Sequence, residues 1–337
     1  MGEHDERCEA MVLEAPGTAL RLRHLPLPVA GPGEILVRVN ACAVCRTDLH
    51  VLDGELPGLR YPIVPGHQIV GRVLAHGAGV TRPAIGSKVG VCWLAGSCGH
   101  CEYCRHGEEN LCDDARFTGW QRDGGYATHC ITRAEFAYTL PEDVGDIELA
   151  PLLCGGVIGY RALRACGAAR RLGLFGFGSA AHIITQVALH QQREVYAFTR
   201  PGDAAAQAFA RRLGAAWAGA SDQLPPQALD AAIIFASDGA LLPAALRTLR
   251  KGGRLVCAAI HMSEIPHFDY ARLWGERSIQ SIANMTRADA VQFLALAPRI
   301  PVRVQTRVYP FTAANQALDD LRAGRFSGTA VLSMAPA

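Results

Sequence analysis

The sequence predicts an α/β protein of two domains, one rich in β-strands and one in which strands and helices alternate around a parallel sheet. Its 337 residues exceed the size of one ordinary domain, and 50% of them are hydrophobic, which is enough for two cores. Short apolar runs fill about the first 150 residues, and a strand–helix alternation begins at about residue 155. We therefore expect domains at residues 1–153 and 154–295, with a C-terminal segment, 296–337, that returns to the first domain.

Three segments of the first domain have the composition of β-strands. Residues 34–44, 67–77 and 87–94 cluster or alternate β-branched and other apolar side chains between glycine and proline. No long helical period interrupts them. The N-terminal stretch MGEHDERCEA is charged and has no apolar centre, so we interpret it as a leader before the first strand and not as a signal peptide.

The second domain contains a regular alternation of strands and helices. Apolar strand patterns at 171–177, 194–200, 230–236, 253–260 and 277–283 are separated by helical patterns at 179–192, 203–215 and 239–250. Such alternation is typical of a parallel sheet with helices on its faces. After about residue 300, short strands return around one helix at 314–324.

Composition excludes several classes of partner. The net charge is only +2, Lys88 and Lys251 are the sole lysines, and arginines are interspersed with acids, which argues against a nucleic-acid partner. No apolar run reaches the roughly 20 residues that span a bilayer, so we expect no membrane partner. Twelve cysteines without an export signal indicate a reducing, cytoplasmic location, where thiols bind metal or stay free.

Four cysteines lie in one short run, SCGHCEYCRHGEENLC. They are Cys98, Cys101, Cys104 and Cys112. Two C-x-x-C spacings followed by a fourth thiol suit one tetrahedral zinc ion with no open position, which is a structural site. A disulfide cluster or scattered buried thiols would be the alternative, but nothing in the chain indicates export.

A glycine-rich turn lies where the second domain begins its alternation. Gly176, Gly178 and Ala181 fit G-x-G-x-x-A between a predicted strand and a predicted helix, which opens with Ser179 and Ala180. The glycines permit a tight turn and close approach to a pyrophosphate, and the helix N-terminus attracts its charge. An ordinary glycine turn is the alternative.

The end of the next predicted strand bears on which dinucleotide is bound. An acidic residue there would hydrogen-bond a ribose 2′-hydroxyl, but the chain has Thr199 and Arg200. A guanidinium suits a 2′-phosphate, so the sequence favours NADP(H) over NAD(H). Alternatively, Arg200 stacks on adenine or faces solvent.

Three further residues suggest a second metal site. Cys45, His67 and Cys154 provide two thiolates and one imidazole, a set that leaves one position of a tetrahedral zinc open for water or substrate. Each residue alone could be structural. Their combination with a cysteine loop and a dinucleotide motif favours a catalytic zinc, and hence two zinc ions per chain.

With these motifs in this order, the chain resembles the zinc-dependent medium-chain alcohol dehydrogenases of the medium-chain dehydrogenase/reductase superfamily, from about residue 11 to about residue 333. The resemblance implies a GroES-like β-barrel catalytic domain, a Rossmann domain and an active site in the cleft between them. It also implies an alcohol or aldehyde as the small-molecule substrate and a homodimer or homotetramer.

The same resemblance assigns roles to the segment around Cys45. Thr47 matches the hydroxyl that links the substrate oxygen to a proton relay, and His50 matches the solvent end of that relay. Asp48 matches the carboxylate that fixes the tautomer of the ligand histidine. Arg46 matches a pyrophosphate contact. The alternatives are a turn residue for Asp48 and plain surface residues for His50 and Arg46.

Two positions bear on rate and specificity. Gln68 stands where the family usually has glutamate, and the less negative surroundings should lower the pKa of the bound alcohol and alter the rate without abolishing it. Trp93 matches an aromatic residue that lines the substrate channel, where an indole would favour primary alcohols and aldehydes; a plain core residue is the alternative. Trp120 and Trp274 could also border the cleft.

Two other functions remain open from the sequence. A zinc-independent quinone or enoyl reductase of the same superfamily would not need the second metal set, and a non-catalytic cofactor-binding protein would not need the relay. Zinc stoichiometry and turnover distinguish these alternatives from a dehydrogenase.

Overall fold

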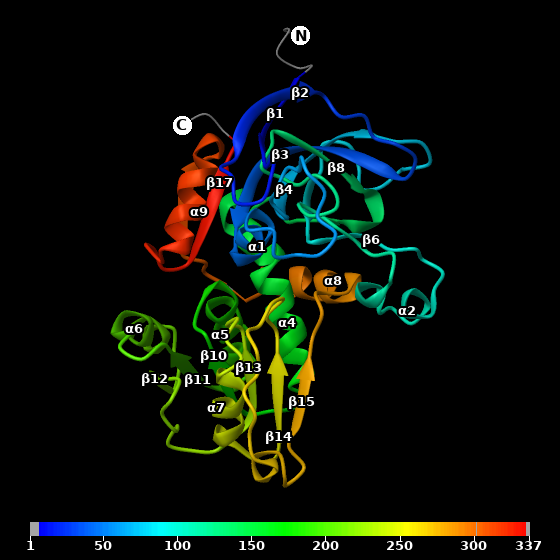
Figure 1. The fold of residues 1–337 in the computed structure, drawn as a ribbon. Coiled ribbons are helices and arrows are strands. Elements are labelled where there is room, and N and C mark those ends of the chain that lie inside the picture. The colour runs from blue at the N-terminus through cyan, green and yellow to red at the C-terminus, as the bar shows by residue number, and fades with distance from the viewer. Residues whose placement is uncertain (1–6, 301, 335–337) are drawn as a thin grey trace. The chain divides into compact units, whose positions relative to one another are not determined.

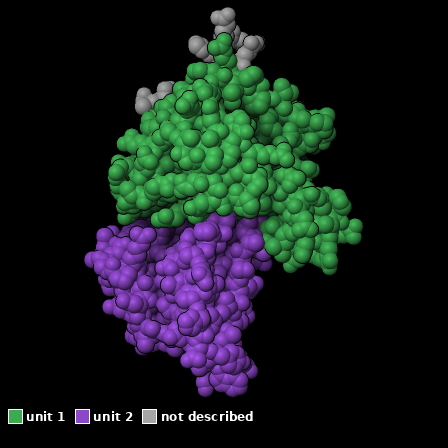
Figure 2. Space-filling model, viewed as in Figure 1, with its two compact units in different colours: residues 1–154, 286–294, 304–337 green, residues 155–285, 295–303 purple. Residues whose placement is uncertain are grey.

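A computed structural model describes residues 7–300 and 302–334 of the chain. The chain divides into two compact units, the first formed by residues 1–154, 286–294 and 304–337 and the second by residues 155–285 and 295–303 (Figure 2). The first strand begins at Arg7, so the expected leader is wrong for residues 7–10, whose apolar side chains are buried in a strand. The first six residues of the expected leader lie outside the described residues.

The first unit is built on a seven-stranded sheet with the order β16–β17–β3–β4–β5–β9 and with β8 paired to β3. Strands β17, β3, β4 and β8 of this sheet are labelled in Figure 1. The strands are β3 (Glu34–Val44), β4 (Gln68–His76), β5 (Lys88–Val91), β8 (His129–Arg133), β9 (Ala137–Thr139), β16 (Thr306–Pro310) and β17 (Thr329–Ser333). Strand β3 is central because it pairs with β4, β8 and β17. Its length and apolar alternation provide the surface on which the core of this unit packs.

Two small sheets complete the first unit. Strands β1 (Arg7–Val12) and β2 (Arg21–Pro26) form a hairpin, and β6 (Leu94–Gly96) pairs with β7 (Arg116–Phe117). The single strand expected at 87–94 is therefore wrong: it is two strands, because the chain leaves the large sheet after Val91 and pairs with the segment that follows the cysteine loop.

The helices of the first unit are short apart from one near the C-terminus. They are α1 (Arg46–Leu52), α2 (Glu102–Arg105), α3 (Asp146–Leu149) with the 3₁₀ turn η4 (Ala150–Leu153), and α9 (Ala314–Arg322). Helix α8 (Arg287–Leu296) spans a division between the units. The sequence pattern did not reveal α8, because its buried face includes Asp289 and its exposed face includes Val291, so apolar side chains do not mark one side of the helix.

The second unit is a six-stranded parallel sheet with the order β12–β11–β10–β13–β14–β15 (Figure 1). Its strands are β10 (Arg171–Phe175), β11 (Glu194–Thr199), β12 (Trp217–Ala220), β13 (Leu229–Ile234), β14 (Leu249–Cys257) and β15 (Ser278–Ser281), and its helices are α4 (Gly155–Ala165), α5 (Ser179–His190), α6 (Ala204–Arg212) and α7 (Leu241–Thr248). This is the doubly wound order of a Rossmann sheet, and its switch point lies between β10 and β13.

Helix α4 was not expected as a separate element because glycine disfavours helices. Its glycines instead permit close packing on α5: a Cβ at Gly159 would lie 2.2 Å from Ile184 Cγ1, and one at Gly155 would lie 3.3 Å from Ser179 Oγ. Within the described residues, none of the helices combines the length and apolar character needed to cross a membrane.

Candidate active site

Three segments of the first unit bring Cys45, His67 and Cys154 together. Cys45 follows the last residue of β3, His67 precedes the first residue of β4, and Cys154 follows η4. Strands β3 and β4 pair through Ala43 and Gln68, so the first two residues leave the same end of the sheet. One ligand atom of each of the three residues lies within 4.8 Å of the others, and Cys45 Sγ is 3.4 Å from His67 Nε2. Such spacing suits a single metal ion.

Helix α1 begins in a way that fixes both Cys45 and the orientation of His67. The Cys45 sulfur accepts a hydrogen bond from the Thr47 N–H, and Asp48 Oδ2 accepts one from the Cys45 N–H at 2.8 Å. The other carboxylate oxygen, Oδ1, lies 3.3 Å from His67 Nδ1. Asp48 and His67 are 1% and 2% exposed, so this pair is shielded from water. The contact leaves His67 Nε2 directed toward Cys45, as metal binding requires.

These donors lie close enough together to shift one another's pKa. Burial lowers the pKa of His67, but Cys45 and Asp48 outweigh it and raise that pKa to about 10. The hydrogen bond to Cys154 and burial raise the pKa of Cys45 well above its ordinary value. A divalent cation at the three donors would reverse both effects, because it favours thiolates and a neutral imidazole. The donor set and its buried carboxylate therefore fit zinc.

Tyr126 is a member of this site that the sequence did not reveal. Its buried ring lies against Gly66, where a Cβ would be 2.3 Å from Tyr126 Cδ1, so only glycine can precede His67 here. Burial raises the pKa of Tyr126 well above its ordinary value, and the charge of Asp48 adds to the effect. Tyr126 therefore lies close to both Gly66 and Asp48, and no local motif indicated this.

Gln68 is the first residue of β4 and is 2% exposed. Within residues 7–300 and 302–334, its amide nitrogen Nε2 has no hydrogen-bond partner. An unpaired buried amide costs free energy, so this position is a place where a bound group could add a hydrogen bond.

Thr47 and His50 lie on the same side of α1 because they are three residues apart in a helix. Thr47 is half-buried, as is His50, whose Nδ1 contacts the Glu55 carboxylate. Glu55 was not predicted, since it lies in the turn that follows the helix. Arg46, the first residue of α1, is exposed.

An aromatic stack stands beside the ligand histidine. The Trp93 ring centroid is 6.1 Å from that of His67 and 4.8 Å from that of Phe117. Trp120 stacks on both, at 5.7 Å from Trp93 and 5.0 Å from Phe117. Trp93 thus lies next to the cluster of metal donors, and Phe117 and Trp120 pack against its ring.

The four-cysteine loop forms a second cluster. Ligand atoms of Cys98, Cys101, Cys104 and Cys112 all lie within 4.8 Å of one another, and all twelve cysteines of the chain are free. Backbone N–H groups of His100 and Cys101 lower the pKa of Cys98 to about 6, which favours the thiolate that zinc needs. Leu94, Ala115 and Phe136 pack against the loop.

The glycine turn of the second unit lies after β10. Gly176 has φ +85°, and a Cβ there would be 2.9 Å from Ala236 Cβ, so glycine is required. Gly178 precedes α5, and a Cβ there would meet nothing within 4 Å, which leaves room for a phosphate. Ala181 is fully buried, Thr199 ends β11 and Arg200 is exposed.

Comparison with known proteins identifies the family. The model of the alcohol dehydrogenase GroES-like domain matches residues 31–142. A probable alcohol dehydrogenase, AdhA, of Mycobacterium tuberculosis is 48% identical over 91% of this chain and 90% of its own length. An alcohol dehydrogenase of Geobacillus stearothermophilus is 33% identical over 97% of this chain and 99% of its own. The chain belongs to the zinc-dependent medium-chain alcohol dehydrogenases.

Solved structures agree with membership of this family. A thermostable alcohol dehydrogenase from Pyrobaculum aerophilum, solved with cobalt and zinc bound, matches with a TM-score of 0.88 at 25% identity and covers 97% of this chain and 99% of its own. The predicted fold class, GroES-like and Rossmann, is confirmed. The individual roles of the site residues stay predictions.

Proposed function

We propose that the chain catalyses reversible hydride transfer between a nicotinamide cofactor and a primary alcohol or its aldehyde. The observation that carries the proposal is the cluster of Cys45, His67 and Cys154, with Asp48 behind His67. Zinc bound there supplies a Lewis acid for the oxygen of the substrate. Three protein donors leave one tetrahedral position open, which is what a catalytic site needs and a structural site lacks.

The chain's own residues supply positioning and proton transfer in this proposal. We propose that the Thr47 hydroxyl, two residues beyond Cys45, exchanges a proton with the substrate oxygen and that His50 with Glu55 continues the path toward solvent; the contact between His50 and Glu55 supports this path. Trp93, braced by Phe117 and Trp120, narrows the space beside His67 and favours unbranched or planar substrates over wide secondary alcohols.

The nicotinamide cofactor is the hydride carrier in this reaction. Gly176 and Gly178 with the N-terminus of α5, formed by Ser179, Ala180 and Ala181, are proposed to bind its pyrophosphate, and Arg46 to contact it. Thr199 and exposed Arg200 at the end of β11 support a preference for NADP(H). We also propose two zinc ions per chain, the second held by the four-cysteine loop.

The test combines zinc content with absorbance at the nicotinamide band. Purified protein is offered NADPH and NADH separately with a panel of aliphatic and aromatic aldehydes. Two zinc ions and aldehyde-dependent oxidation are expected, faster with NADPH, and an Arg200→Ala variant should lose that preference. One zinc ion with quinone-dependent oxidation would favour the reductase alternative, and two zinc ions without any turnover would favour a binding protein.

A further inference from the structure

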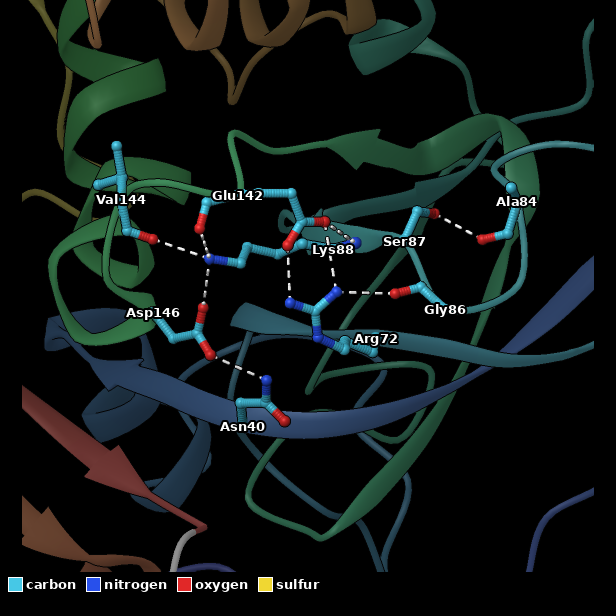
Figure 3. A network of polar contacts seen from close by, with 9 residues as sticks. All are labelled: Asn40, Arg72, Ala84, Gly86, Ser87, Lys88, Glu142, Val144 and Asp146. Carbon is cyan, nitrogen blue, oxygen red and sulfur yellow. Dashed lines mark hydrogen bonds and ion pairs between the residues drawn. The ribbon is translucent and has the colours of Figure 1, made fainter.

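Lys88 is a nearly buried cation in the first unit, with a side chain that is 5% exposed. Its ammonium group forms an ion pair with Asp146 Oδ1 at 3.0 Å and donates to the carbonyls of Val144 at 2.8 Å and Glu142 at 3.3 Å (Figure 3). The ammonium group thus has two carbonyl acceptors and one carboxylate as its ion-pair partner. A charge buried this completely is costly unless it is paired, so the network holds its partners in one arrangement.

All three partners of Lys88 belong to the segment that leads to Cys154. Asp146 is the first residue of α3, and α3 continues through η4 up to Cys154. The second oxygen of Asp146 accepts a hydrogen bond from Asn40 in β3 at 2.8 Å, and Glu142 forms an ion pair with Arg72 in β4 at 2.7 Å (Figure 3). Side chains of three neighbouring strands, β3, β4 and β5, therefore bind the start of this segment through hydrogen bonds and ion pairs.

The end of the segment that leads to Cys154 packs against β5, the strand that contains Lys88. Gly90 lies two residues further along β5, and a Cβ there would be 2.5 Å from Leu153 Cδ2 and 3.1 Å from Leu140 Cδ1. The missing side chain thus leaves the space that Leu153 occupies. Leu153 is fully buried and directly precedes Cys154.

The three metal donors differ in what supports them. Cys45 and His67 leave β3 and β4 directly, so the pairing of these strands sets their separation. Cys154 ends a helical segment that belongs to no strand, so its position depends on how that segment is attached to the sheet. Lys88 and Gly90 attach this segment to β5, and Asn40 and Arg72 attach it to β3 and β4, the strands that carry the other two donors.

We propose that Lys88 is a positioning residue for Cys154: it fixes residues 142–153 on the sheet so that the Cys154 sulfur lies beside the Cys45 sulfur and the His67 imidazole nitrogen. The inference rests on the proposed function in that Cys154 serves as a zinc ligand. The role of Lys88 is additional to the proposed function, because this side chain lies outside the metal site.

The chain offers a matched control, because Lys251 is its other lysine and is exposed in the second unit. Lys88→Met and Lys251→Met are compared with the unaltered protein by zinc release to a chromophoric chelator. Lys88→Met should release one zinc equivalent about tenfold faster, as expected when the support of a ligand is removed. The other zinc equivalent of Lys88→Met should be released at the rate of the unaltered protein. Both zinc equivalents of Lys251→Met should also be released at that rate.

Peptide-mapped alkylation identifies which cysteines become accessible. After zinc is stripped, Lys88→Met should raise alkylation of Cys154 relative to Cys45, while the pattern over Cys98–Cys112 stays as in the unaltered protein. Asn40→Ala, which removes one hydrogen bond from Asp146, should also raise alkylation of Cys154 relative to Cys45, but by less. If Lys88→Met does not fold, the alkylation ratio of Asn40→Ala tests the proposal instead.

Two results would overturn the inference. One is a folded Lys88→Met protein with unaltered zinc release and an unaltered Cys154 to Cys45 alkylation ratio. The other is equal acceleration of both zinc equivalents, which means general loosening of the fold. If the unaltered protein itself holds only one zinc ion, the proposed function fails, and the alkylation ratio still tests the placement of Cys154.

Discussion

The two cysteine clusters of the first unit are assembled in different ways. Donors of the four-cysteine loop lie within one run, from Cys98 to Cys112, and Cys98, Cys101 and Cys104 are only half-buried. Those of the other cluster come from Cys45, His67 and Cys154, which are brought together by β3, β4 and η4. A local loop can close around a metal by itself, whereas the dispersed donors meet only when the sheet has formed.

This difference also separates structural and catalytic use. Four thiols complete a tetrahedron and exclude substrate, while three donors leave a position open. The dispersed cluster has a buried carboxylate, Asp48, behind its histidine, and the four-cysteine loop has backbone N–H groups directed at sulfur. Variants of the two clusters should therefore fail in different ways.

The largest effect is expected for Cys154→Ser. Removal of a ligand from the open cluster should eliminate one zinc ion and lower kcat/KM roughly a thousandfold or more, since Lewis-acid stabilisation contributes several kcal/mol. Circular dichroism should stay unaltered because the fold does not depend on that metal. Cys257→Ser, at a half-buried thiol of the second unit, is the control; loss of both zinc ions would contradict the separation of the clusters.

A smaller effect on activity and a larger one on stability are expected for Cys101→Ser. The loop packs against Leu94 and Phe136, so loss of its metal should lower Tm by about 5 °C or more in a scanning measurement. Zinc content should fall by one, and the folded fraction should keep most of its kcat. A protein with unaltered Tm and no activity would reverse the assignment of the two clusters.

Asp48→Asn tests whether the buried carboxylate supports zinc binding at the cluster of Cys45, His67 and Cys154. The amide keeps the shape of the side chain but removes the charge that faces His67 Nδ1, so zinc affinity or kcat/KM should fall by about tenfold. Chelator competition measures the affinity and should show the loop zinc unaffected. Equal weakening at both sites would mean that Asp48 supports the fold and not the histidine.

The smallest effect is expected for Gln68→Glu. An added negative charge beside the cluster disfavours ionisation of the bound alcohol, so its pKa rises and the pH profile of alcohol oxidation should move upward by about half a pH unit. The rate at the optimum should change by about threefold or less. A downward movement of the profile would show that the charge of residue 68 does not act on the substrate oxygen.

The sequence predicted what depends on local pattern. Strand β3 begins and ends where its apolar alternation does, at Glu34 and Val44, and the turn at Gly176 lies between a strand and a helix as expected. The cysteine loop was evident because its donors are neighbours. Cys45, His67 and Cys154 were grouped by their donor chemistry together with the cysteine loop and the dinucleotide motif, since nothing local links them.

The remaining features depend on distant segments and were not predicted. Lys88 contacts residues 142–146, Tyr126 contacts Gly66, and Phe117 contacts Trp93 because the fold brings these distant segments together. The break between β5 and β6 follows from pairing with β7, which no pattern within 87–94 reveals. Packing between remote residues decides these contacts, and single-sequence periodicity does not contain it.

The most direct test of this account is zinc stoichiometry measured together with aldehyde-dependent NADPH oxidation, in the unaltered protein and in Cys154→Ser. Two zinc ions with turnover are expected in the unaltered protein, and one zinc ion without turnover is expected in Cys154→Ser. Full turnover with a single zinc ion, or a Cys154→Ser protein that keeps both zinc ions and its activity, would contradict it.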